Sequence, residues 1–116
     1  MNYEEVFKAK VIEGLHELSD EAFQRRVWLA SSGPEVSSFS EAICGLFDDT
    51  GLSIDLEHGK LPSVFSNEIY EGLRGLGKLV DRAARQFRSL PPTVIIEHPQ
   101  MQEIRSVAAN VLAKME

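Results

Sequence analysis

The chain of 116 residues contains one cysteine, Cys44, which excludes an internal disulfide and is typical of a reducing compartment. It also lacks any apolar run near the roughly 20 residues that a membrane-spanning helix needs. Its first residues, Met1-Asn2-Tyr3-Glu4-Glu5, have neither the basic nor the apolar block of a secretory signal. We therefore expect a cytoplasmic protein that does not enter a membrane.

Positive charge and aromatic residues are also scarce. Twelve Lys and Arg stand against 18 Asp and Glu, the formal net charge is −6, and aromatic residues make up 8 % of the chain. A nucleic-acid backbone or an anionic membrane surface demands a broad basic face, so we expect neither as a partner. A basic protein is the partner that this charge favours.

Hydrophobic residues make up 43 % of the chain. Most of them recur at helical spacing. This predicts an all-α fold: a single domain over residues 1–116, built as a bundle of four to five helices. In the first helix, from about Tyr3 to Leu18, the residues expected on the buried side are Phe7, Val11, Ile12, Leu15 and Leu18.

In the first half of the chain, the sequence contains clear signals for two helix starts and one helix end. Ser19 is expected to cap a second helix over Asp20–Leu29. Ser38 and Glu41 form a capping box of the type Ser-x-x-Glu and predict the start of a third helix there. That helix should end at the run Asp48-Asp49-Thr50-Gly51, before a short helical turn over Ser53–His58.

The second half predicts the longest helix, which Ser66 and Asn67 open and Leu90-Pro91-Pro92 ends. A three-four alternation over three heptads indicates packing along its whole length, with apolar positions Ile69, Leu73, Leu76, Val80, Ala83, Phe87 and Leu90. Thr93–Glu97 is expected to be an extended, proline-flanked connector, because it is β-branched but has no partner strand. The last helix is expected over Gln100–Met115.

Residues 35–71 carry eight acids against one base, Lys60, and the following 17 residues reverse the sign. Because the same stretch is rich in large apolar residues, it predicts a folded acidic surface rather than a solvated tail. Asp48 and Asp49 stand at the expected end of a helix, where the dipole disfavours negative charge, which suggests a use beyond folding. The carboxylates that we expect to bind a partner are Glu35, Glu41, Asp48, Asp49, Asp55 and Glu57.

No motif predicts catalysis or a cofactor. Gly72–Lys78 matches the G-x-x-x-x-G-K core of a phosphate-binding loop, but Leu79 replaces the required Ser or Thr and no strand precedes it. Cys44 has no histidine or base at a diagnostic spacing and is expected to be a small core residue. We therefore expect a binding protein, neither an enzyme nor a cofactor protein.

A family resemblance adds to this prediction. The run Arg26–Thr50, followed by Val64–Tyr70 and Leu79–Arg82, resembles small helical immunity proteins of contact-dependent growth inhibition and related polymorphic-toxin systems, over roughly residues 23–84. The resemblance implies that the chain binds and blocks the toxic carboxyl-terminal domain of a cognate effector. Many such toxins are nucleases with basic clefts, which an acidic helical surface can imitate.

Three aromatic residues have two possible roles. An exposed Trp28, Phe39 or Phe47 would be the desolvated anchor of the interface. Trp28 and Phe47 could instead belong to the core, which is the interpretation we favour for them.

Two other functions stay open. In a helical homodimeric scaffold or regulatory protein, the helix over Ile69–Leu90 would be the dimer interface, and the oligomeric state is not determined by the sequence. In a carboxylate-histidine metal protein, the pairs Glu13/His16 and Asp55/His58 would supply the ligands. We expect no metal, since a di-iron bundle needs two further core carboxylates.

Overall fold

The computed structural model describes residues 3–30, 36–59 and 65–116, and within these ranges every regular element is a helix. The all-α class predicted from the sequence is confirmed, and in the described part five helices have seven residues or more. The elements in chain order are α1 (Tyr3–Ser19), α2 (Glu21–Val27), α3 (Phe39–Ile43), the π-helical segment η1 (Cys44–Asp48), α4 (Leu52–His58), α5 (Asn67–Phe87), α6 (Pro92–Glu97) and α7 (Pro99–Met115).

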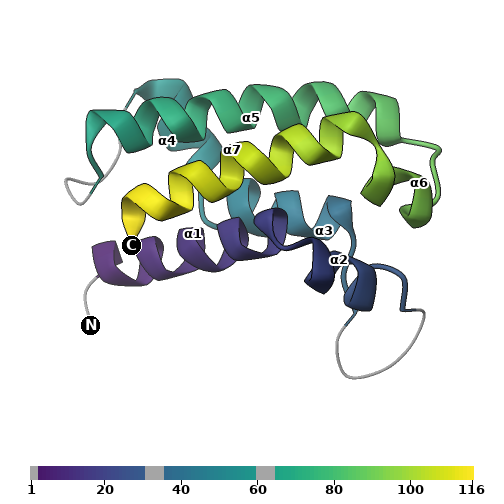
Figure 1. The fold of residues 1–116 in the computed structure, drawn as a ribbon. Coiled ribbons are helices and arrows are strands. Elements are labelled where there is room, and N and C mark those ends of the chain that lie inside the picture. The colour runs from purple at the N-terminus through teal and green to yellow at the C-terminus, as the bar shows by residue number, and fades with distance from the viewer. Residues whose placement is uncertain (1–2, 31–35, 60–64) are drawn as a thin grey trace.

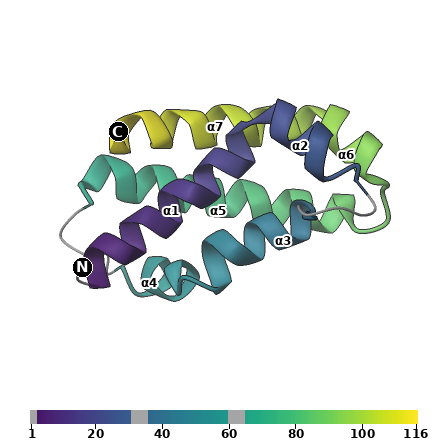
Figure 2. The ribbon, with the colours of Figure 1, turned by 90° about the horizontal axis from the view of Figure 1, so that it is seen from below.

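Three long helices, α1, α5 and α7, form the body of the bundle (Figure 1). Helix α7 packs along both α1 and α5. In the view from below, α7 lies along one side of the molecule and α3 and α4 lie along the other, with α1 and α5 between them (Figure 2). Segment η1 contacts α1, and α4 contacts both η1 and α5. The helices α3 and α4, which carry part of the acidic stretch, therefore lie on the side away from α7.

The apolar stripes predicted for the long helices form the core. In α1 the buried residues are Phe7, Val11, Leu15 and Leu18, with Ile12 partly buried. In α5 all the predicted positions from Ile69 to Phe87 are buried, and Leu90 is partly buried. Helical spacing alone identified these residues because each long helix buries one continuous face.

Helices α2, α3 and α5 each begin with a side-chain cap. Ser38 Oγ accepts a hydrogen bond from the Glu41 amide at 3.1 Å, and Ser66 Oγ accepts one from the Ile69 amide at 3.3 Å, which confirms both predicted starts. The predicted Ser19 cap is wrong by one residue. Asp20 caps α2 instead, accepting from the Phe23 amide at 3.0 Å, and its negative charge also suits the helix amino terminus.

The extended connector predicted over Thr93–Glu97 is wrong, because Pro92–Glu97 forms helix α6. Pro91 is extended and acts as the cap, which places Pro92 at the first helical position, where the fixed φ angle of proline suits a helix. The Val94 and Ile95 amides both donate to the Pro91 carbonyl, and burial of Ile96 holds the turn against the bundle. This packing outweighs the preference of the β-branched residues for an extended backbone.

A buried polar network joins α1, α2, α6 and α7. The Gln24 side chain is fully buried, and its Nε2 donates to the carbonyls of Glu17 and Leu18 at the end of α1. Arg105 of α7 donates from Nη1 to Gln24 Oε1 at 2.6 Å and from Nη2 to the Ile96 carbonyl at 2.8 Å. These bonds satisfy carbonyls that the helix ends leave free. Burial lowers the pKa of Arg105, an effect that nearby Glu21 opposes.

Two glycines allow helices to approach closely. A Cβ atom at Gly14 would lie 2.9 Å from Leu46 Cβ, and one at Gly72 would lie 2.7 Å from Val111 Cγ2. These glycines thus bring α1 onto η1 and α5 onto α7. The glycines of the Gly72–Lys78 run lie inside a continuous helix, which agrees with a packing role for Gly72 and not with a phosphate-binding loop.

Gly72→Ala should lower the free energy of unfolding by about 1–2 kcal/mol, because a clash with the stiff, β-branched Val111 outweighs the better helix propensity of alanine. Gly75→Ala is the matched control in the same helix, where a Cβ meets nothing within 4 Å. It should leave stability unchanged or raise it by up to about 1 kcal/mol. Urea titration followed by circular dichroism measures both, and an equal gain for the two variants would disprove the close contact.

Candidate protein-binding surface

The predicted site carboxylates that the structure describes come from three consecutive elements. Glu41 lies on α3, Asp48 and Asp49 lie at the end of η1, and Asp55 and Glu57 lie on α4. All are exposed except Asp55, which is half-buried. Glu35, the sixth predicted carboxylate, lies outside the described residues.

Segment η1 determines where the side chains of Asp48 and Asp49 point. Its π-helical turn is closed by the Asp49 amide, which donates to the Cys44 carbonyl five residues back at 2.9 Å. The extra residue in the turn lets two successive side chains, Leu46 and Phe47, both face the core. Thr50 Oγ1 donates to the Leu46 carbonyl at 2.6 Å and accepts from the Leu52 amide at 3.1 Å, so it joins the end of η1 to α4.

Asp49 lies in a groove between α1 and η1, which we call the acidic groove. It has a volume of about 210 Å³, and the carboxylates along it are Glu13, Glu17, Glu41 and Asp49, with Lys10 as the single base. Glu13 and Glu17 come from α1 and were not predicted as partner-binding residues; Glu13 was considered only as a metal ligand beside His16.

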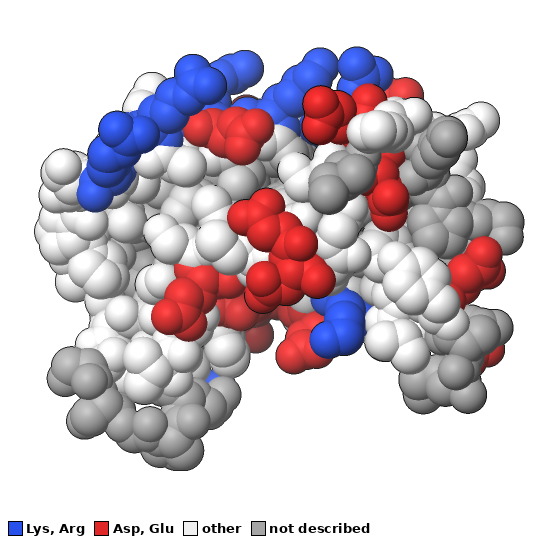
Figure 3. Space-filling model, turned by 180° about the vertical axis from the view of Figure 1, so that it is seen from behind, with Lys and Arg blue, Asp and Glu red and all other residues white. Residues whose placement is uncertain are grey.

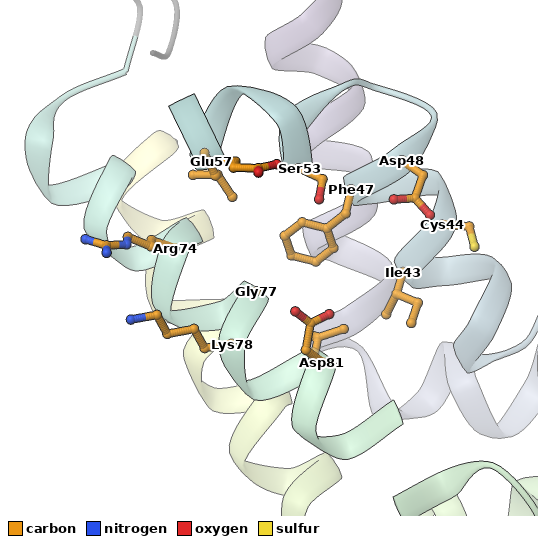
Figure 4. Close-up of a pocket in the computed structure, with 12 residues that line it drawn as sticks. Ile43, Cys44, Phe47, Asp48, Ser53, Glu57, Arg74, Gly77, Lys78 and Asp81 are labelled. Atoms are coloured by element: carbon orange, nitrogen blue, oxygen red, sulfur yellow. The ribbon is translucent and has the colours of Figure 1, made fainter. Parts of the chain in front are cut away.

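Asp48 lies instead in a cleft between η1, α4 and α5, which we call the α5 cleft. Its volume is about 340 Å³. Ile43 and Phe47 provide apolar surface, the carboxylates are Asp48, Glu57 and Asp81, and the bases are Arg74 and Lys78 (Figure 4). The paired aspartates of the sequence are therefore divided between two neighbouring depressions.

We call the six carboxylates Glu13, Glu17, Glu41, Asp48, Asp49 and Glu57 the acidic face. Figure 3 shows acidic side chains gathered over the middle of the side that is hidden in Figure 1. Within the described part of the chain, no Lys, Arg or His nitrogen forms an ion pair with any of the six. The internal arginine, Arg105, is directed to Gln24, Ile96 and Glu21 and neutralises none of them. Glu17 accepts hydrogen bonds from Trp28 and Ser37, and the negative charge of the other five is available to a partner.

A basic stripe borders this face. Arg74, Lys78, Arg82 and Arg85 are exposed on α5, and Arg88 is exposed directly after its last residue. In Figure 3 the basic side chains form a row along the upper edge, where α5 lies, directly beside the acidic side chains. The surface is therefore acidic with a basic border, and a complementary partner needs the opposite arrangement.

The three aromatic residues proposed as exposed anchors are buried, so that hypothesis is wrong. The exposed fractions are 4 % for Trp28, 5 % for Phe39 and 8 % for Phe47. The Trp28 indole N–H donates to the Glu17 carboxylate at 3.0 Å, and its ring packs edge-on against Phe39. Phe39 packs in the same way against Phe87 of α5. The core position favoured for Trp28 and Phe47 is confirmed.

Cys44 is exposed, which contradicts its predicted place in the core. Cys44 is the first residue of η1 and lies on the rim of the α5 cleft. Partial desolvation raises the pKa of its thiol, and the nearby Asp48 carboxylate raises it further. Cys44 is thus accessible but not activated as a nucleophile.

The two carboxylate-histidine pairs stay apart from each other. His16 is exposed on α1 and lies 3.4 Å from Glu116, while His58 is exposed at the end of α4. Among residues 3–30, 36–59 and 65–116, no three His, Cys, Asp or Glu side chains converge as metal ligands would. The ligand set of a di-iron bundle is not assembled by these residues.

The sequence did not indicate that Glu13, Glu17 and Asp81 belong to the site. Glu13 and Glu17 are spaced one helical turn apart on the polar side of α1, but nothing in the sequence says that α3 and η1 lie beside them. Asp81 sits within the basic stripe and gave no sign that it faces η1. Only the packing of helices distant in sequence brings these carboxylates together.

The reactivity of Cys44 tests the geometry at the cleft rim. The thiol pKa, measured from the pH dependence of alkylation by iodoacetamide, should be higher in the folded protein than in the protein unfolded in urea. Asp48→Asn should lower that pKa and speed alkylation at pH 8, whereas Asp55→Asn should do neither. A folded-state pKa at or below the unfolded value would contradict the structure around Cys44.

Comparison with known proteins gives one match. No curated protein and no solved structure matches the chain. In the part of the chain that the structure describes, no helix has both the length and the apolar character needed to cross a bilayer. One family model, described as Domain of unknown function (DUF7945), matches residues 1–109. The chain therefore belongs to the DUF7945 family.

Proposed function

We propose that this chain is a protein-binding module that captures a basic protein on its acidic face. The partner we propose is the toxic carboxyl-terminal domain of a cognate contact-dependent growth inhibition effector, which the chain neutralises as an immunity protein in the cytoplasm. The observation that carries the proposal is the set of six exposed or half-exposed carboxylates on one side of the bundle without ion-pair partners in the described part of the chain.

Unpaired charge of one sign has a physical consequence. Like charges on a folded surface repel one another, and a basic surface that docks against them removes this repulsion. The attraction acts over a Debye length of about 8–10 Å at physiological salt, so it accelerates encounter before contact is made. Rapid capture is what an inhibitor of a toxic protein needs.

We infer the identity of the partner from the resemblance to immunity proteins. A nuclease toxin holds phosphates in a basic cleft, and the acidic face presents carboxylates in place of those phosphates. The basic stripe of α5 would then lie at the edge of the interface, where it disfavours partners that are basic throughout.

The two other functions have less support. The apolar face of α5 is buried within the chain, with Leu73 and Leu76 fully buried, so a homodimer through it would have to open the core. A metal protein would need ligands that the described residues do not bring together.

The double substitution Asp48→Lys, Asp49→Lys places a positive charge in both depressions. We expect the helical circular-dichroism signal to persist and the association rate with the toxin domain to fall about tenfold or more at low salt, with a weaker dependence on salt. The control is Glu97→Lys, Glu103→Lys, which makes the same change in net charge on exposed residues of α6 and α7 and removes only the exposed ion pair of Glu97 with Arg25. Surface plasmon resonance at several salt concentrations should show the control within about twofold of wild type, because screening limits the effect of distant charges.

Growth provides the functional test. The carboxyl-terminal domain encoded by the gene beside this one is expressed from an inducible promoter, with and without this chain. We expect growth arrest by the domain alone and rescue by wild type and by the control variant, but weakened rescue by Asp48→Lys, Asp49→Lys. Arrest that the wild-type chain does not relieve would refute the immunity function, and full rescue by the double variant would remove these aspartates from the interface.

A further inference from the structure

The α5 cleft combines an apolar surface with acidic edges. Phe47 is only 8 % exposed and Ile43 is half-buried, so both present surface within the cleft without projecting from the protein. Figure 4 shows the Phe47 ring between α5 and η1, with the Asp81 side chain reaching from α5 toward Phe47 and Ile43. Asp48 approaches from the η1 side, next to Cys44.

The charges of the cleft do not neutralise one another. Arg74 and Lys78 point away from the Phe47 ring, while Asp48 and Asp81 lie at the other end of the cleft (Figure 4). Across the part of the chain that the structure places, neither aspartate has a basic nitrogen within the 4.0 Å of an ion pair. The cleft therefore has an acidic end that lacks an internal counter-ion.

These features fit one kind of occupant. Arginine and lysine side chains carry a long apolar stem with a cation at the tip, so the stem gains from apolar contact while the cation seeks a carboxylate. An arginine could make charge-assisted hydrogen bonds with more than one carboxylate oxygen, and such bonds are stronger than those between neutral groups. A volume of about 340 Å³ is ample for one such side chain.

We propose that the α5 cleft is the anchor pocket of the interface and receives an arginine or lysine side chain from the basic partner, with its stem on Phe47 and Ile43 and its cation between Asp48 and Asp81. This inference rests on the proposed function for the identity of the partner. It replaces the aromatic anchors expected from the sequence: the projecting side chain comes from the partner, and this chain supplies the pocket.

The first test uses the complex with the toxin domain. Asp81→Asn removes one charge from the pocket, and Glu13→Gln removes one charge from the acidic groove, outside the pocket. We expect Asp81→Asn to speed dissociation at least about tenfold, because it leaves the partner's cation with the Asp48 carboxylate on one side only, and Glu13→Gln to change dissociation less than about threefold. Cys44, on the rim of the pocket, should be protected from iodoacetamide in the complex.

The second test needs no partner. N-acetyl-argininamide should slow the alkylation of Cys44 in a saturable way, whereas N-acetyl-citrullinamide, its neutral analogue, should not when sodium chloride matches the ionic strength. Asp81→Asn should abolish the protection. Asp81 is suited to this test because it does not contribute to the raised pKa of the Cys44 thiol.

The outcomes separate the two proposals. If wild type binds the toxin domain, but Asp81→Asn dissociates no faster and Cys44 stays reactive in the complex, the pocket is refuted while the proposed function stands. If wild type does not bind the domain, the proposed function fails. The pocket is then tested only by whether N-acetyl-argininamide protects Cys44 from alkylation. Equal effects of the arginine and citrulline analogues would then refute the pocket as well.

Discussion

The site depends on one packing contact, that of Leu46 with Gly14. A side chain at position 14 would collide with Leu46, so α1 and η1 can lie this close only because Gly14 has none. The contact fixes Leu46 in the core, and the π-helical turn then places Phe47 beside it. With two neighbouring residues held inside, Cys44, Asp48 and Asp49 are held outside. The positions of the carboxylates thus follow from the core.

Segment η1 is held by buried contacts, but the negative charges at its carboxyl end are electrostatically unfavourable. Asp48 and Asp49 stand at the carboxyl end of η1, where the helix dipole disfavours them, and the described residues offer no cation to compensate. The buried contacts of Leu46 and Phe47 and the bonds of Thr50 hold the segment despite this cost. A partner that brings positive charge to this end of η1 would relieve the strain, which is why we place the interface there.

The sequence predicted what local signals determine and failed where distant packing decides. Ser38 and Ser66 cap the helices they were expected to cap, and the α5 stripe is buried as its spacing indicates. Cys44 was misplaced because its neighbour Ile43 was taken to mark the buried side of the helix. The buried positions are Phe39, Ala42 and Leu46, and Cys44 lies on the opposite side. Thr93–Glu97 was expected to be extended because β-branched residues outweighed the signal of Pro92 at a helix start.

The candidate site also has features that the sequence predicted and features that only the packing of the helices determines. The acidic character of α3, η1 and α4 was visible in the composition, but its separation into a groove and a cleft was not. Glu13, Glu17 and Asp81 join the site through contacts between α1, η1 and α5, which are distant in the chain. The aromatic anchors failed because a large exposed ring and a large buried ring look alike in a sequence.

Hydrogen–deuterium exchange of the chain, alone and in complex with the toxin domain, tests the central claim most directly. The account predicts slower exchange over Phe39–His58 and over the middle of α5, from Arg74 to Asp81, with exchange in α7 unchanged. Protection confined to α6 and α7, with no change over Phe39–His58, would contradict it.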